Sequence, residues 1–147
     1  MPSFEDYALT NKTYRYYTGE PLYPFGYGLS YGDVHVTALS ADKQEATVTA
    51  VNRGATATEE VIQLYVKDTV SPDVPVNPVL CGFKRIALAP GVEKTVKIPI
   101  GANAFTAVTA EGHRIPGTGP WKLYAGLGQP DARTEALTGK KALRVIL

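Results

Sequence analysis

From residue 33 onward, apolar and polar residues alternate along the chain in short runs. Within residues 46–50, three alanine or valine residues alternate with two threonines. A period of two is typical of β-strands with one buried face, whereas helical spacing is scarce in this chain. The run at 62–66 differs because its intervening positions are also fairly apolar, which predicts a central strand. We therefore expect strands at 34–39, 46–50, 62–66, 83–88, 95–100, 105–109, 121–125 and 143–147.

The intervals between these runs contain residues that favour turns or exclude strands. Asn and Gly in 52–54 tolerate positive φ, and 89–91 places Pro90 directly before Gly91, which suits a tight turn. Three prolines in 71–78 lack the amide hydrogen that a β-ladder requires, so we expect an extended surface loop there. Short strands separated by such turns, with no convincing helix, predict an all-β, antiparallel β-sandwich.

The first 32 residues differ in composition from the rest. They contain seven of the 9 tyrosines, together with glycines and prolines that break helices and long strands. We interpret residues 1–32 as an extended aromatic arm and residues 33–147 as the sandwich domain. Two interpretations of the arm remain open: its rings wrap the domain's own core, or they form an interface with a partner, where amphipathic aromatic residues are enriched.

Length and charge exclude several classes of protein. A chain of 147 residues with 44% hydrophobic content is expected to form one domain that needs neither disulfides nor a metal. Its net charge of +1 gives no basic surplus for nucleic acid or an anionic membrane, and no apolar run approaches the length of a membrane helix. The single cysteine leaves the compartment undecided, and the localisation of the protein stays open.

Candidate catalytic residues are scattered. A glycosidase needs two carboxylates at a set distance, but Glu59 and Glu60 are adjacent on an expected strand and so point to opposite faces. The weakest hypothesis is a free-standing hydrolase that uses Asp68, Asp73 or Glu111.

Other chemistries lack the sequence context that they need. Ser30 fits a G-x-S-x-G pattern, yet it lacks the strand before and the helix after that a nucleophile elbow requires. His35, His113 and Cys81 have no metal-ligand spacing, and we expect no cofactor. Trp121 is either a core residue or a platform on which a sugar ring stacks, and we favour the core.

Two blocks of sequence resemble a known family. The first runs from Thr13 through the stretch YPFGYGLSY at 23–31, and the second is GFKRI at 82–86 followed by APG at 89–91. They are similar to the C-terminal fibronectin type III-like domain of family 3 glycoside hydrolases, which are β-glucosidases and β-xylosidases. Residues 48–54, 60–66 and 121–126 resemble further strands of that domain in the expected order.

This resemblance implies an immunoglobulin/fibronectin type III-like sandwich that is last in a three-part enzyme. The nucleophile and the acid/base of the family belong to the other two domains, and no position of this chain matches their motifs. The partner implied is therefore the catalytic domains of a parent glycosidase, against which the arm packs; a second copy of the chain is a further alternative.

The residues expected to contact those domains lie in the arm and in the proline loop. The expected role is a non-catalytic accessory domain that braces the catalytic domains or aids dimerisation, with a carbohydrate-binding module as the alternative. In the loop the candidates are Asp73, Val74, Pro75 and Val76. In the arm they are Tyr14, Tyr16, Tyr17, Tyr23, Phe25, Tyr27 and Tyr31.

Overall fold

The computed structural model describes residue 5 and residues 9–71 and 74–147 of the chain. Most elements are strands, in the order α1 (Thr13–Tyr16), β1 (Val34–Ala41), β2 (Glu45–Asn52), β3 (Thr58–Asp68), β4 (Val79–Leu88), β5 (Glu93–Pro99), β6 (Thr106–Val108), β7 (Arg114–Pro116), β8 (Trp121–Gly126), α2 (Ala132–Thr138) and β9 (Leu143–Ile146). None of the helices in the described part of the chain has the length and apolar character needed to cross a membrane.

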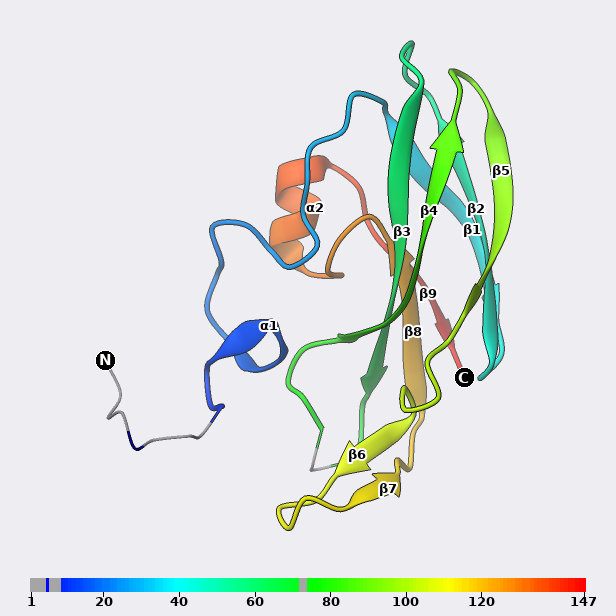
Figure 1. Ribbon diagram of the computed structural model, residues 1–147. Coiled ribbons are helices and arrows are strands. Elements are labelled where there is room, and N and C mark those ends of the chain that lie inside the picture. The colour runs from blue at the N-terminus through cyan, green and yellow to red at the C-terminus, as the bar shows by residue number, and fades with distance from the viewer. Residues whose placement is uncertain (1–4, 6–8, 72–73) are drawn as a thin grey trace.

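Two antiparallel sheets face each other and form the sandwich (Figure 1). One has three strands in the order β1-β2-β5, and the other has four in the order β4-β3-β8-β9. The core lies between them because alternate residues of both sheets point inward, among them Val48 and Ile98 from the first sheet and Leu64 and Leu123 from the second. All four of these side chains are fully buried. The sequence prediction of an all-β sandwich is therefore confirmed.

A buried polar residue joins the two sheets at one end. Asn52, at the end of β2, donates from Nδ2 to the carbonyls of Thr56 (2.8 Å) and Leu88 (3.2 Å). Its Oδ1 accepts from the amides of Gly54 (2.9 Å) and Asp33 (3.2 Å). A buried amide costs little when its donors and acceptors are all used, so Asn52 can hold the predicted 52–54 turn against the start of β1 and the end of β4.

Three elements differ from the sequence prediction, and the first is α1, a helix of 4 residues in the arm that was expected to be extended. Residues 112–120 contain a short strand, β7, which pairs with β6 as a separate two-stranded hairpin below the sandwich (Figure 1). The expectation of no helix is wrong at α2, where the Asp131 carboxylate accepts from the Thr134 amide at 2.6 Å and Gly139 ends the helix with a φ of 67°. With only 7 residues, α2 is too short to show helical periodicity in the sequence.

Candidate docking surface

The arm lies on the outer face of the four-stranded sheet. Ile62, Leu64 and Val66 of β3 point into the sandwich core, so Gln63 and Tyr65 point to the opposite face. Both would be exposed on a bare sheet, yet Gln63 is 8% exposed and Tyr65 is 0% exposed. The sequence predicts that both faces of β3 are fairly apolar. In the structure one face packs in the sandwich core and the other packs beneath the arm.

Hydrogen bonds to main-chain carbonyls hold the arm in this place. Gln63 Nε2 donates to the Gly26 carbonyl at 3.0 Å, and the Gln129 amide donates to the Phe25 carbonyl at 2.9 Å. The Tyr65 hydroxyl donates to Gln63 Oε1 at 2.6 Å and lies 3.4 Å from the Phe25 carbonyl oxygen. Burial raises the pKa of Tyr65 above its usual value, which keeps the hydroxyl protonated as a donor.

Gly26 is required at this point of the arm. Its φ is 76°, which an L-residue rarely adopts, and a Cβ built there would overlap the Gln63 side-chain amide. A side chain at position 26 would therefore separate the arm from β3.

A second set of contacts holds the beginning of the arm. Asn77, near the end of the proline loop, donates from Nδ2 to the carbonyls of Tyr14 (2.8 Å) and Tyr17 (2.7 Å). The Tyr14 hydroxyl accepts from the Leu80 amide at 3.2 Å, and its ring stacks on Phe25 with centroids 4.0 Å apart. The described part of the arm is thus fixed to the sandwich at both α1 and residues 25–26.

The predicted aromatic residues divide into two groups. Tyr14, Tyr16 and Tyr27 are half-buried against this chain, whereas four are exposed: Tyr17, Tyr23, Phe25 and Tyr31. The exposed fractions are 93% for Tyr31 and 70% for Tyr23, and two leucines that the prediction did not include, Leu22 and Leu29, are 80% and 92% exposed. We call the side chains of Leu22, Tyr23, Leu29 and Tyr31 the docking surface. The first interpretation of the arm applies to the half-buried rings, and an interface with a partner stays a prediction for the exposed residues.

A groove of about 830 Å³ runs between the arm and α2. Tyr17, Tyr23 and Phe25 line one side, and Arg133 lines the other, where it pairs with Glu20 at 3.2 Å. Sequence reasoning missed the contribution of α2. The helix could have been found from its capping residues, Asp131 and Gly139.

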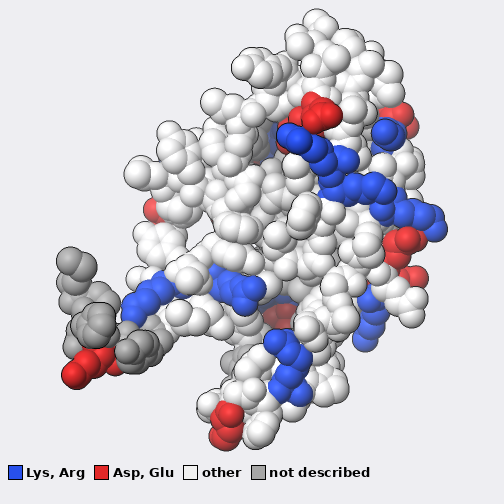
Figure 2. Space-filling view, in the orientation of Figure 1, with Lys and Arg blue, Asp and Glu red and all other residues white. Residues whose placement is uncertain are grey.

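Charged groups are sparse over the arm. In Figure 2 the upper left part of the molecule, where Figure 1 places α2 and the later part of the arm, is mostly white, whereas blue groups lie near α1 and blue and red groups gather over the strands at the right. Ion pairs on the sheets include Arg85 with Glu59 (3.2 Å) and Lys97 with Glu45 (2.8 Å). The four exposed apolar side chains of the arm are therefore candidates for an interaction site.

The proline loop is held against the end of β3. The Lys67 ammonium donates to the carbonyls of Pro75 (2.5 Å) and Val76 (2.7 Å), and burial lowers the pKa of Lys67. Val74 and Pro75 are half-buried and Val76 is exposed. Asp73, the fourth residue predicted for this loop, lies outside the described residues.

The carboxylates suggested for catalysis are not brought together. Asp68 is 3% exposed and accepts from the amides of Val70 (2.8 Å) and Ser71 (3.0 Å) and from the Ser71 hydroxyl (2.6 Å). Burial opposes its ionisation, but these hydrogen bonds lower the pKa of Asp68, so it is an ionised residue that caps a turn. Glu111 is exposed in the β6–β7 turn, and Asp73 is not described.

The remaining chemical candidates also have structural surroundings. Ser30 bonds to the Thr58 hydroxyl at 2.9 Å in a segment that is neither strand nor helix. No group of three or more His, Cys, Asp or Glu residues that could hold a metal ion occurs in the described part of the chain. The idea that Trp121 is an exposed sugar platform is wrong, because Trp121 is 3% exposed and meets Phe105 edge-to-face with centroids 5.3 Å apart.

Comparison with known proteins agrees with the fold. Residues 60–128 match the fibronectin type III-like domain. The chain is 39% identical over 103 residues to thermostable β-glucosidase B of Acetivibrio thermocellus, covering 63% of this chain and 14% of that protein. It is 30% identical over 145 residues to a xylan 1,4-β-xylosidase of Xylanibacter ruminicola, covering 94% of this chain and 17% of that protein.

A solved structure shows the same arrangement. The β-glucosidase DesR of Streptomyces venezuelae, in complex with D-glucose, matches with a TM-score of 0.68 and 28% identity over 87% of this chain and 16% of that one. The chain therefore spans less than a fifth of each of these proteins. Residues 60–128 and the two antiparallel sheets resemble a fibronectin type III-like domain. As the two sequence blocks predict, its relatives are the β-glucosidases and β-xylosidases of glycoside hydrolase family 3.

Proposed function

We propose that this chain is a non-catalytic accessory domain that braces the catalytic domains of a family 3 β-glycosidase. The observation that supports the proposal is the arm, which this domain's own side chains fix while Leu22, Tyr23, Leu29 and Tyr31 stay exposed. The chain has the length of only a small part of its relatives, so the natural occupant of this surface is the remainder of such an enzyme.

The energetics favour a permanent contact over a transient one. Burying one large apolar side chain contributes about 1.5–3 kcal/mol, and the docking surface has four. The arm is already ordered by contacts with β3 and Asn77, so binding pays little further conformational entropy for its backbone. A preformed apolar surface of this kind is suited to hold neighbouring domains at a fixed angle.

A mixing experiment tests the proposal. The catalytic portion of the enzyme that carries this chain is purified separately, and β-glucosidase activity, β-xylosidase activity and thermal stability are measured alone and after mixing. We expect association, a higher melting temperature of the catalytic portion and higher activity. The chain alone should turn over neither chromogenic substrate.

Variants then assign the contact to the docking surface. Tyr23→Ser and Leu29→Ser should each weaken association by at least about tenfold, since buried apolar contacts at the centre of an interface cost about 1–2 kcal/mol or more when removed. Ile115→Ser is the matched control, because Ile115 is 41% exposed on β7, in the β6–β7 hairpin and outside the arm. Equal loss in all three variants, or no association at all, would contradict the proposal.

Two other outcomes would redirect it. Concentration-dependent self-association that Tyr23→Ser abolishes would assign the surface to a second copy of the chain. Retention on insoluble glycan, with no binding to the catalytic portion, would favour a carbohydrate-binding module; the groove beside α2 would then be the site to mutate, through Tyr17 and Arg133.

A further inference from the structure

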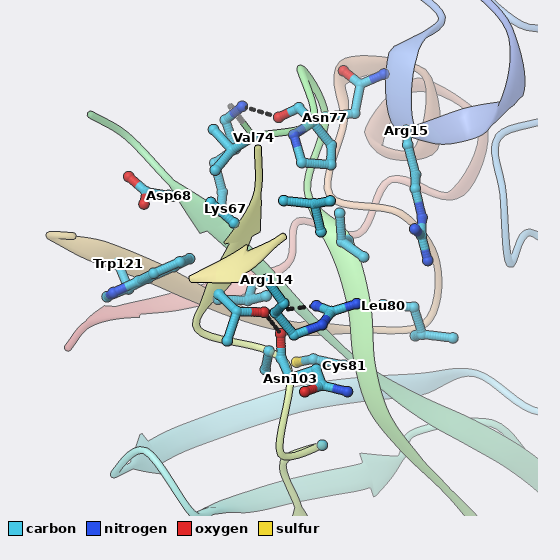
Figure 3. A pocket seen from close by; sticks show the side chains of 18 of the residues that line it. Arg15, Lys67, Asp68, Val74, Asn77, Leu80, Cys81, Asn103, Arg114 and Trp121 are labelled. Carbon is cyan, nitrogen blue, oxygen red and sulfur yellow. Dashed lines mark hydrogen bonds between the residues drawn. The ribbon is translucent and has the colours of Figure 1, made fainter. Parts of the chain in front are cut away.

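A second hollow, distinct from the groove beside α2, lies between α1, the proline loop and the β6–β7 hairpin. Its volume is about 380 Å³. Figure 3 shows that Arg15 enters it from α1, Lys67 from β3 and Arg114 from β7, with Trp121 and Cys81 at its edges. Three elements that are far apart in the sequence thus each contribute one cation to a single cavity.

Within the described residues, the two arginines of this cavity form no ion pair, and Lys67 has Asp68 nearby. Among the described residues that line it, Asp68 is the single acid, and its oxygens accept from Val70 and Ser71. Within the same part of the chain, neither Arg15, Lys67 nor Arg114 forms an ion pair, whereas four other cations do. Those pairs are Arg85–Glu59, Lys97–Glu45, Arg133–Glu20 and Lys140–Asp33.

Hydrogen-bond donors of these side chains are still unused. Arg114 uses one guanidinium N–H on the Thr106 hydroxyl, at 2.8 Å, out of the five it has. Lys67 uses two of three N–H groups on the proline loop. The Arg15 guanidinium makes a contact with the Tyr14 ring, with Cζ 5.9 Å from its centroid, which leaves its donors unoccupied by carboxylates.

The position of Arg15 is fixed by the fold. The Asn77 amide N–H donates to the Arg15 carbonyl at 2.9 Å, and Asn77 Nδ2 holds the carbonyls on either side of it, those of Tyr14 and Tyr17. The short helix therefore places Arg15 at the rim of the cavity, where its side chain stays exposed. A guanidinium placed in advance loses less side-chain entropy when it binds a ligand.

Apolar side chains form part of the cavity wall, beside polar ones such as Asn77 and Asn103. Val74, Val79, Leu80 and Ala107 line the cavity together with the buried Trp121. Low-dielectric walls strengthen an interaction between opposite charges compared with the same pair in bulk water.

We propose that this cavity is a carboxylate-binding pocket, in which Arg15 and Arg114 hold an anionic group and the apolar walls contact the body of the ligand. Guanidinium groups match the planar carboxylate with paired N–H donors. The volume admits more than the carboxylate alone, so the ligand class is a uronic acid or an acidic side chain carried by a polypeptide. This proposal does not depend on the docking role of the arm.

The test is a titration of the complete chain, followed by amide chemical shifts and by calorimetry. The probes are glucuronate, glucose as the neutral analogue, and N-acetyl-glutamate as the amino-acid carboxylate, each at low and at physiological salt. We expect saturable shifts with glucuronate at the pocket residues, none with glucose, and weaker binding at higher salt. Tighter binding of glucuronate than of N-acetyl-glutamate would identify a sugar acid as the ligand, and the reverse would identify a protein side chain.

Substitutions keep the proposal falsifiable. Arg15→Gln and Arg114→Gln should each weaken glucuronate binding by about tenfold or more, while both variants keep the melting temperature of the parent chain. Lys94→Gln removes one positive charge from β5, outside the pocket, and should change the affinity less than about twofold. The proposal is overturned if no carboxylate gives saturable shifts, or if Lys94→Gln weakens binding as much as Arg15→Gln.

Discussion

The outer faces of the two sheets differ in what they contact. On the three-stranded sheet, the outward residues of β2 and β5 are threonines and charged groups, with Thr49 bonded to Thr95 at 2.9 Å and Lys97 paired with Glu45. On the four-stranded sheet, Gln63 and Tyr65 occupy equivalent outward positions but are buried beneath the arm. The comparison teaches that a polar outward residue has no fixed role: its role depends on the layer that covers it.

Gly26→Ala is expected to have the largest effect on this difference. The methyl group would meet the Gln63 amide, and the positive φ disfavours any side chain, so the free energy of unfolding should fall by about 3 kcal/mol. Chemical denaturation measures this loss. Gly91→Ala is the control, because Gly91 has a φ of 71° but open space around it, and it should cost only about 1 kcal/mol. Equal losses would mean that strain alone, and not the contact with β3, explains the requirement for glycine.

Tyr65→Phe should have a smaller effect. It removes the hydroxyl that donates to Gln63 Oε1 and leaves that buried oxygen without this partner, at a cost of about 1–2 kcal/mol. Thr49→Val removes a hydroxyl pair on the uncovered sheet and should change stability by less than about 0.5 kcal/mol. Denaturation of both variants tests the contrast directly, and a loss for Thr49→Val that matches Tyr65→Phe would contradict it.

Alkaline pH should affect the covered sheet in particular. Burial raises the pKa of Tyr65 above the usual value of 10.0 and raises the pKa of Cys81 to about 12 from 9.0. Both groups are neutral when protonated, and the unfolded chain releases these protons first. The contribution of these two groups to the free energy of unfolding is therefore fully present below pH 9. It falls as the pH rises, first because of Cys81 and above pH 10 because of Tyr65 as well.

Thermal unfolding at a series of pH values measures this decline. Cys81→Ala should reduce the loss of stability that begins near pH 9. Tyr65→Phe should reduce the further loss that begins near pH 10. Tyr31→Phe changes an exposed tyrosine and should leave the profile unaltered. A profile that neither Cys81→Ala nor Tyr65→Phe changes would show that other groups cause the alkaline loss.

Substitutions of the docking surface should have the smallest effect on the isolated chain. Leu29 and Tyr31 are 92% and 93% exposed, so Leu29→Ser and Tyr31→Ser should shift the free energy of unfolding by less than about 0.5 kcal/mol. A larger loss would indicate that the end of the arm also supports the sandwich.

The strands could be predicted from the sequence because alternation reports directly on burial in a sandwich. The 62–66 run was expected at the centre, and β3 lies between β4 and β8. The burial of Gln63 could not be predicted. Its hydrogen-bond partner, the Gly26 carbonyl, is distant in the sequence and reaches it only in the folded chain. Helix α2 and strand β7 are too short to show periodicity in the sequence. The helix depends on its capping residues, and the strand depends on pairing with β6.

The candidate site was foreseen in part. The density of tyrosines indicated a special segment, but not which rings this domain would use for itself. That division depends on Asn77 and Tyr65, which are distant from the arm in the sequence. Nothing in the sequence around either residue indicates that it contacts the arm. The groups lining the cationic cavity are likewise brought together only by the fold.

The arm is held mainly through its carbonyl groups at Tyr14, Tyr17, Phe25 and Gly26, and a carbonyl is the same whichever side chain follows it. Evolution can therefore exchange the residues at 22, 23, 29 and 31 with little penalty to folding. Such a domain can be adapted to new neighbours, or transplanted between enzymes, by changing only what it presents.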